Sequence, residues 1–195
     1  MEIKDTEILM RSQFLNIKAT EYEDKNGNKK FWVWAQRPAN RKAVVIVAVV
    51  DKGMIEFSPN HFERDLRLVV TKEFRVPLNG YEFGFPAGLI DENESIEETA
   101  KRELFEETGL KIKRIIQTSP FVYNSPGMTD ESVTIVFCEA EGEPSIQNNE
   151  ASEEIEIIIA DQNKIKEILG DPKNKIGAKA WLIFNQFVGY NPFGI

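Results

Sequence analysis

The run from Gly88 to Leu110, GLIDENESIEETAKRELFEETGL, constrains the fold of this chain more than any other feature. Ser95, followed three residues later by Glu98, forms the capping-box pattern that starts a helix. Gly109 suits the left-handed conformation that commonly ends one. Because the residues between them are good helix formers, we expect a helix that begins near Ile96 and stops at Gly109.

Three glutamates of the expected helix share one face. At about 100° per residue, Glu103, Glu106 and Glu107 lie together. Glu103 and Glu107 also align with Ile96 and Ala100, the side expected to turn inward. Inward carboxylates repel one another and are costly to desolvate, unless a cation lies among them. Oxygen ligands of this kind suit Mg²⁺ or Mn²⁺. A solvated acidic helix face is the alternative for such a pattern met in isolation.

Arg102 lies four residues from both Glu98 and Glu106, a spacing at which helical side chains meet. We predict that it supports catalysis by orienting a carboxylate rather than by touching substrate. Gly88 belongs to the loop that leads into the helix.

Composition and charge narrow the functional classes. The net charge of −8 argues against nucleic-acid or membrane partners. It leaves room for an anionic small substrate, because bound metals and a few arginines reverse the local field. Cys138 is the only cysteine, which excludes an intrachain disulfide and thiolate zinc sites. His61, the only histidine, is interpreted as a surface residue. Without a signal-type N-terminus or an apolar run of membrane length, a cytoplasmic location is expected.

The remaining patterns predict a mixed sheet with helices on both sides, an α/β/α sandwich. Residues 1–40 are expected to form a small N-terminal antiparallel β-sheet region, and 41–195 the main domain. Strands are predicted at 14–22, 30–36, 43–50, 66–74, 112–118, 133–139 and 155–159, helices at 161–169 and 177–187, and loops at 57–65, 77–86 and 141–152.

The residues of the 88–110 run match the Nudix box: Gly88, Glu94, Arg102, Glu103, Leu104, Glu106, Glu107, Gly109 and Leu110. The chain therefore resembles the Nudix hydrolases, which cleave a diphosphate linked to another group X by using divalent metal. The resemblance implies the Nudix-type α/β/α sandwich. It also implies that two or three Mg²⁺ ions, or Mn²⁺, are bound by Glu103, Glu106, Glu107 and the backbone carbonyl of Ala87.

Three further stretches resemble the ADP-ribose pyrophosphatase branch of this family. They are the KEFRVP and YEFGFPAGLID segments at 72–77 and 81–91, the turn Ser125-Pro126-Gly127, and the N-terminal hairpin with Trp32 and Arg37. Pro126 lies sixteen residues beyond Leu110, the spacing associated with ADP-ribose specificity. Gly84 departs from the pattern, because the branch usually carries Glu there. The resemblance implies a homodimer formed by exchange of the small sheet.

Arginines are the expected diphosphate ligands, because a guanidinium binds phosphate oxygens two bonds at a time. Arg75 and Arg37 are the candidates, although Arg37 is equally consistent with a structural loop arginine before Pro38.

An adenine ring needs an aromatic partner. Trp32 is the first candidate, with Phe14 and Trp34 behind it, and only one of the two tryptophans is expected to face the ligand. Pro126 and Gly127 either form a simple tight turn or shape the terminal-ribose pocket beside the metal site.

A further carboxylate is expected to orient or deprotonate the attacking water. In the resembled branch this group comes from a loop after the box, and the matching region is 150–153. Glu153 is the first choice, Glu150 the second and Glu131 the third. A solvated loop glutamate is the alternative for each.

The leading hypothesis is Mg²⁺-dependent hydrolysis of ADP-ribose to AMP and ribose 5-phosphate. One alternative keeps the chemistry and changes X, to a nucleotide sugar, NADH, a dinucleoside polyphosphate or a noncanonical nucleoside triphosphate. Another is a non-catalytic nucleotide sensor with the Nudix fold. The intact box and the lack of a DNA-binding extension argue against a sensor.

Overall fold

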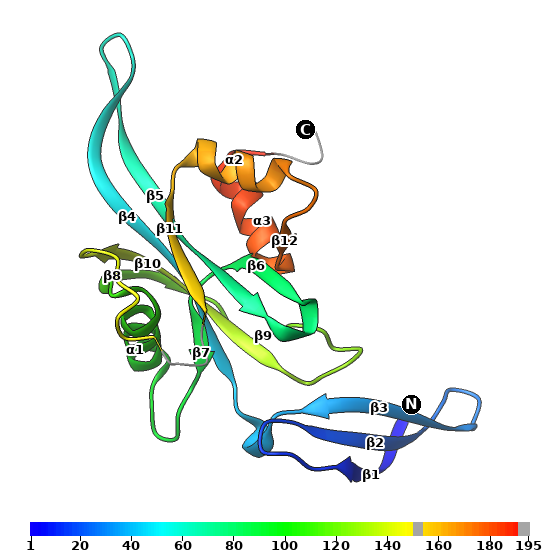
Figure 1. Cartoon of the computed structure of the whole chain (residues 1–195). Coiled ribbons are helices and arrows are strands. Elements are labelled where there is room, and N and C mark those ends of the chain that lie inside the picture. The colour runs from blue at the N-terminus through cyan, green and yellow to red at the C-terminus, as the bar shows by residue number, and fades with distance from the viewer. Residues whose placement is uncertain (150–153, 191–195) are drawn as a thin grey trace.

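A mixed β-sheet forms the centre of the molecule, with one helix on one face and two helices on the other (Figure 1). The computed structural model describes residues 1–149 and 154–190. The helices are α1 (Ile96–Thr108), α2 (Gln162–Gly170) and α3 (Ala178–Phe187). The strands of the central sheet are β4 (Ala43–Ser58), β5 (His61–Arg75), β6 (Gly80–Gly84), β7 (Ala87–Leu89), β8 (Lys111–Thr118), β9 (Val122–Tyr123), β10 (Ser132–Glu141), β11 (Ile155–Ala160) and β12 (Lys175–Ile176).

The sheet runs in the order β12-β6-β5-β4-β10-β8, and β11, β7 and β9 pair with β5, β4 and β10 respectively. Strand β4 is parallel to β10 and antiparallel to both β5 and β7. Short β7 thereby lies beside the first residues of β4. This pairing holds the segment just before the acidic helix against the centre of the sheet.

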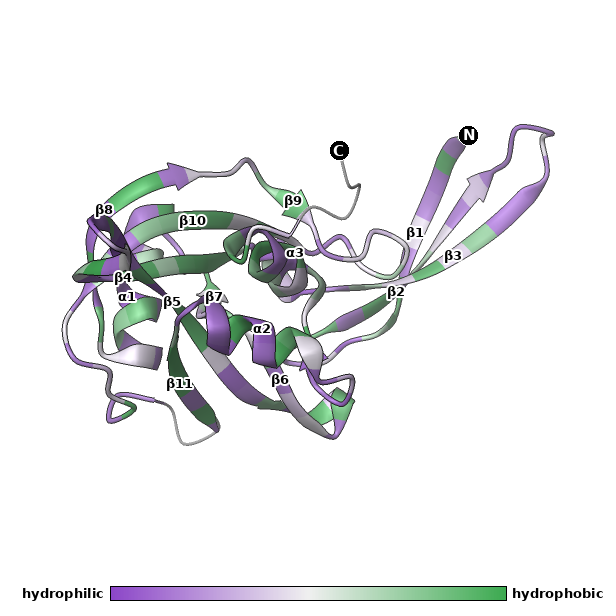
Figure 2. Ribbon diagram, turned by 90° about the horizontal axis from the view of Figure 1, so that it is seen from above, coloured by the Kyte–Doolittle hydropathy of each residue, from purple (hydrophilic) through white to green (hydrophobic). Residues whose placement is uncertain are grey.

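The alternation of side chains along β4 supplies both hydrophobic cores. Val44 and Ile46 are fully buried in a core that includes Leu104 of α1. Their neighbours Val45 and Val47 lie in a second core that includes Phe184 of α3. Successive strand residues point to opposite faces, so this apolar strand has helices on both sides. The predicted α/β/α arrangement is confirmed, and Figure 2 shows how hydrophobic the central strands are.

A second, three-stranded sheet extends away from the central one (Figure 1). It consists of β1 (Glu2–Met10), β2 (Asn16–Glu23) and β3 (Lys29–Gln36), all antiparallel. The predicted turn between β2 and β3 is present, and the Asp24 carboxylate accepts hydrogen bonds from the backbone N–H groups of Asn26 and Asn28 at 2.8 and 3.0 Å. Two short 3₁₀ turns, η1 (Pro38–Asn40) and η2 (Val76–Leu78), complete the described elements. No helix in the described residues is long and apolar enough to cross a membrane.

Two predicted loops are wrong. Residues 57–65 are not a loop, because β4 and β5 continue as a paired hairpin that turns between Ser58 and His61. A two-stranded ribbon needs only its partner for backbone hydrogen bonds, so it extends beyond the core without an alternating burial pattern. Within 77–86 the chain forms the end of η2 and the strand β6, which pairs with β5.

Candidate active site

Local signals fix both ends of helix α1 as the sequence predicts. The Ser95 hydroxyl accepts a hydrogen bond from the backbone N–H of Glu98 at 3.2 Å, and the Glu98 carboxylate accepts one from the backbone N–H of Ser95 at 2.9 Å. Gly109 ends the helix with φ of 71°, and its N–H donates to the carbonyl of Phe105 at 2.8 Å. The start and the end of this helix are therefore set by residues within the 88–110 run itself.

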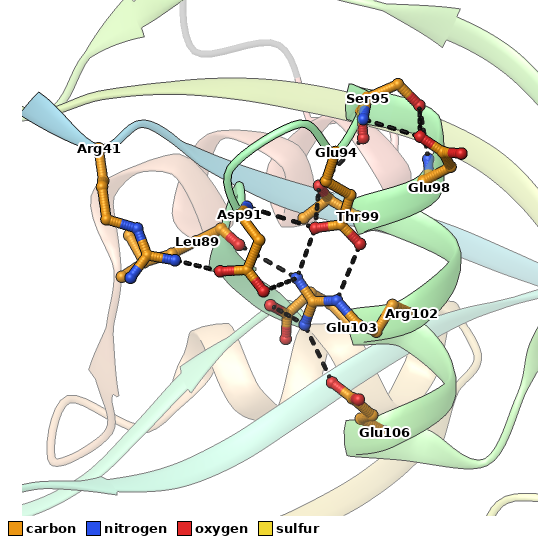
Figure 3. A network of polar contacts seen from close by, with 10 residues as sticks. All are labelled: Arg41, Leu89, Asp91, Glu94, Ser95, Glu98, Thr99, Arg102, Glu103 and Glu106. Atoms are coloured by element: carbon orange, nitrogen blue, oxygen red, sulfur yellow. Dashed lines mark hydrogen bonds and ion pairs between the residues drawn. The ribbon is translucent and has the colours of Figure 1, made fainter. Parts of the chain in front are cut away.

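Arg102 joins the loop before α1 to the acidic face of the helix (Figure 3). Its Nε and Nη2 donate to the two carboxylate oxygens of Glu94 at 2.9 and 2.8 Å. Its Nη1 donates to Glu103 at 2.7 Å and to Glu106 at 3.0 Å, and Nη2 also reaches the carbonyl of Leu89 at 3.1 Å. Of the two predicted partners, Arg102 contacts Glu106 but has no described contact with Glu98, whose carboxylate caps the helix at Ser95. Glu94 and Glu103 are partners that the spacing did not predict.

This ion-pair network changes the titration of its members. Hydrogen bonds from Arg102 are the main cause that lowers the pKa of Glu94 to about 2, and Thr99 adds a further hydrogen bond. The same contacts, led by Glu94, raise the pKa of Arg102 above its usual value. Both groups therefore stay charged throughout the physiological pH range.

Two carboxylates of the box lie against β7. Glu107 is buried, with 5% of its surface exposed, and its Oε1 accepts a hydrogen bond from the N–H of Ala87 at 3.3 Å. A Cβ atom added at Gly88 would lie 1.8 Å from Oε1 of Glu103. Only glycine therefore leaves room for the Glu103 carboxylate at this point. Glu106 is nearer the surface, with 46% of its side chain exposed.

The four predicted metal ligands thus come from one helix and the strand beside it. They all supply oxygen atoms, which is the donor chemistry that Mg²⁺ and Mn²⁺ prefer. Among the described residues no group of three or more acidic, histidine or cysteine side chains is already gathered as a metal centre. These oxygen atoms are chemically suited to a hard divalent cation, and they come from β7 and from the helix that lies against it.

A cavity of about 420 Å³ lies beside Ala87 and Gly88. Both predicted diphosphate ligands, Arg37 and Arg75, line it. The guanidinium of Arg75 contacts Glu73 at 2.6 Å and Glu82 at 3.5 Å. The structure thereby brings both arginines to the cavity that adjoins the metal-ligand strand.

Glu131 lines the same cavity and has a partner on each carboxylate oxygen. Arg37 Nε donates to its Oε1 at 2.6 Å, and Asn124 Nδ2 donates to its Oε2 at 2.6 Å. Burial alone would raise the pKa of Glu131, but these hydrogen bonds and the charges of Arg37 and Lys179 outweigh burial and lower it. A carboxylate held in this way is a weak base, so its contacts favour the positioning of Arg37 over proton transfer.

Lys179 of α3 and Asn124 are cavity residues that the sequence did not indicate. The Lys179 ammonium donates to Oδ1 of Asn124 at 2.6 Å. Neither residue belongs to a local motif, and they meet only because the sheet brings α3 close to the segment after β9. Only the tertiary structure identifies them, because no local sequence pattern links the two residues.

Trp32, the residue predicted to bind adenine, lines a different cavity. This cavity has a volume of about 350 Å³ and lies between the N-terminal sheet and the 124–131 segment. Trp32 and Trp34 both line it, because residues two apart on a strand share a face. The expectation that only one of them faces a ligand site is therefore wrong. Phe14 lies between β1 and β2, is 73% exposed and lies outside the described lining of this cavity.

The turn at Pro126 and Gly127 packs against β3. Trp32 Nε1 donates to the carbonyl of Gly127 at 3.1 Å, and Pro126 lines the cavity with the two tryptophans. The structure places this turn on the tryptophan cavity rather than on the cavity beside Ala87. The 124–131 segment separates the two, with Asp130 lining one and Glu131 lining the other.

Glu150 and Glu153 lie outside the described residues. Described residues before and after them form hydrogen bonds to α1 and to the strands β5 and β6. Ser145 N–H donates to the carbonyl of Thr108 at the end of α1, at 2.8 Å. On the other side, Glu154 accepts a hydrogen bond from the Tyr81 hydroxyl, and its carbonyl accepts one from Phe74 N–H at 3.1 Å.

Comparison with known proteins shows which family and which relatives this sequence resembles. The NUDIX domain family matches residues 40–176. An uncharacterised Nudix hydrolase of Schizosaccharomyces pombe is 32% identical over 142 residues, covering 70% of this chain and 64% of that protein. The ADP-ribose pyrophosphatase of Saccharomyces cerevisiae is 33% identical over 129 residues, covering 66% and 54%. The ADP compounds hydrolase NudE of Escherichia coli is 36% identical over 107 residues, covering 55% and 50%.

This chain thus spans half to two thirds of the length of these three curated relatives. A crystal structure of an ADP compounds hydrolase superposes with a TM-score of 0.72 at 24% identity, covering 96% of this chain and 93% of that one. This likeness shows the fold. Nudix hydrolases generally depend on divalent metal ions.

Proposed function

This chain belongs to the Nudix family, and we propose that it hydrolyses the diphosphate bond of ADP-ribose or of a closely related nucleoside diphosphate derivative. One observation carries the proposal. The Glu103 and Glu107 carboxylates of the intact box lie against Gly88 and Ala87, and these two residues also line the cavity that holds Arg37 and Arg75. This supports the proposal that carboxylates for metal and guanidinium groups for phosphate act on the same substrate, one set on each side of β7.

We propose Glu103, Glu106, Glu107 and the Ala87 carbonyl as the ligands of two or three Mg²⁺ ions. When bound, the metal supplies neutralisation of the diphosphate charge and activation of water. Arg102 holds the carboxylates of Glu103 and Glu106 in place through its two hydrogen bonds.

The guanidinium groups of Arg75 and Arg37 bind the diphosphate oxygens. Glu131, whose other oxygen accepts a hydrogen bond from Asn124, holds Arg37 at the cavity, so the arginine is ordered before substrate arrives. Net hydrolysis adds one water across the bond between the phosphates and gives AMP and ribose 5-phosphate from ADP-ribose. Glu153, and Glu150 after it, are proposed to take the proton of that water, because their flanking residues join α1 and β6.

Trp32 is proposed to stack on adenine. The 124–131 segment separates its cavity from the one with the arginines, so a second copy of the chain would supply the tryptophan side of the site. A homodimer formed through residues 1–40, in the cytoplasm, is part of the same proposal. Sedimentation of the purified protein at micromolar concentration measures the oligomeric state.

A related nucleotide is the second candidate substrate, and Gly84 is the observation that favours it. Gly84 lines the cavity, and a Cβ added there would meet only Thr71 Oγ1 at 3.9 Å. The structure has room for a Cβ atom at this position, but the glycine has no side chain to cover this part of the cavity wall. An open wall accommodates groups X other than ribose.

The test is product analysis with Mg²⁺ and a panel of ADP-ribose, nucleotide sugars, NADH, dinucleoside polyphosphates and nucleoside triphosphates. We expect AMP and ribose 5-phosphate from ADP-ribose, and loss of both products in Glu107→Gln. Glu97→Gln is the matched control, because Glu97 is an exposed glutamate on the first turn of the same helix.

Preferential cleavage of another panel member would move the substrate and keep the mechanism. Tight nucleotide binding without any cleavage would indicate that the protein is a nucleotide sensor and not an enzyme.

A further inference from the structure

The cations of the 420 Å³ cavity differ in how their charge is balanced. Among the described residues that line it, the cationic side chains are Arg37, Arg75 and Lys179. Arg37 is paired with Glu131, and Arg75 with Glu73 and Glu82. The described partner of Lys179 is the neutral amide of Asn124. Lys179 therefore lies near enough to Glu131 to lower the pKa of that carboxyl, but, unlike the two arginines, it forms no described ion pair with a carboxylate.

The backbone that carries Lys179 is firmly held. A Cβ added at Gly177 would lie 2.8 Å from Oε1 of Glu82, so the first turn of α3 packs directly on β6. The N–H of Gly177 also donates to the carbonyl of Phe83 at 3.2 Å. Ala180, the next residue in α3, is buried. The backbone of Lys179 therefore has a fixed position beside the cavity.

An ammonium group has three N–H donors. One of those on Lys179 is used by Asn124 Oδ1, and Asn124 is itself fixed by its bond to Glu131. The remaining donors are available to a ligand in the cavity. A phosphate oxygen is a strong acceptor for them, because both partners are charged.

We propose that Lys179 is a specificity-determining residue for substrates whose group X carries a phosphate of its own, beyond the diphosphate bound by the arginines and the box. The inference rests on the proposed function and concerns the related nucleotides that it admits besides ADP-ribose. A dinucleoside triphosphate belongs to this class, because one additional phosphate separates the two nucleosides. A dinucleoside diphosphate is identical except that it lacks this phosphate.

The test compares these two ligands directly. The values of kcat/KM for diadenosine triphosphate and diadenosine diphosphate are measured with Mg²⁺ for the unsubstituted protein, Lys179→Ala and Lys179→Arg. Loss of a hydrogen bond between charged groups lowers binding by about tenfold or more. We expect Lys179→Ala to lower the triphosphate-to-diphosphate ratio of kcat/KM by about tenfold, and Lys179→Arg to keep the ratio within about threefold.

The matched control is Lys166→Ala, which removes the same charge from an exposed position on α2, away from the cavity. An unchanged ratio in Lys179→Ala, or an equal fall in Lys166→Ala, overturns the assignment of Lys179. Titration calorimetry of the same two dinucleotides in the absence of Mg²⁺ gives the corresponding ratio of binding constants. If no substrate is cleaved, the proposed function fails, and this binding ratio still decides the role of Lys179.

Discussion

Replacing Gly88 by alanine tests the proposed active site most directly. The new Cβ would lie 1.8 Å from Oε1 of Glu103 and 1.9 Å from its Cδ, whereas real Cβ contacts are not shorter than 3.0 Å. The carboxylate must therefore move by more than about 1 Å, a misplacement that costs on the order of 100-fold in rate when it affects a reacting group. We expect kcat/KM for ADP-ribose to fall about 100-fold, which corresponds to about 2.7 kcal/mol.

Stability should change far less than activity. The clashing atoms are the end of a flexible side chain, so the clash is relieved by a rotation rather than by a backbone shift. The contact at risk is the hydrogen bond from Arg102 to Glu103, worth about 1 kcal/mol. For a chain of this size that is a fall in Tm of about 2–4 °C, measured by calorimetry next to the kinetics.

Two controls separate the proposed cause from others. Gly84→Ala adds the same methyl group to the same cavity at an ordinary 3.9 Å contact, and its kcat/KM should stay within about threefold of the unsubstituted protein. In a Glu103→Gln background, Gly88→Ala should cost little more, because both changes act through one carboxylate. Full activity in Gly88→Ala, or an equal loss in Gly84→Ala, would refute the argument.

Three further predictions concern single side chains. Glu107→Gln should abolish turnover and leave the circular dichroism spectrum unchanged; activity within threefold of the unsubstituted protein would exclude the metal role. Arg75→Ala should mainly raise KM for ADP-ribose through lost diphosphate binding, and a fall in kcat alone would contradict that reading. The pKa of Glu94 is lowered from 4.5 to about 2, so its ionised form stabilises the fold fully above pH 4.5 and progressively less toward pH 2. Urea midpoints measured from pH 6 to 2.5 should therefore fall more steeply for the unsubstituted protein than for Glu94→Gln, and parallel curves would show that the Arg102 contact contributes nothing.

The parts of the fold that were predictable from sequence are those with local causes. Helix α1 begins and ends at its own capping residues, and the β2–β3 turn is closed by the side chain of Asp24. The box glutamates follow from the same logic, because their shared face depends only on helical geometry.

Elements without such local causes were missed. Every residue of β1 is exposed, so the strand leaves no pattern of burial in the sequence. The β4–β5 hairpin beyond the core is invisible for the same reason. Asn124 and Lys179 reach the cavity through a hydrogen bond between residues 55 positions apart, and spacing along the chain carries no information about that pairing.

The cavity also has a consequence for how the protein is made. Its lining combines residues that are far apart in the sequence, from Arg37 before β4 to Lys179 in α3. Synthesis on the ribosome releases the box helix well before residue 179 is added. A growing chain therefore carries its acidic helix without an enclosed substrate cavity. Under the proposed function, nucleotides in the cell are not exposed to a hydrolytic site until helix α3 has packed.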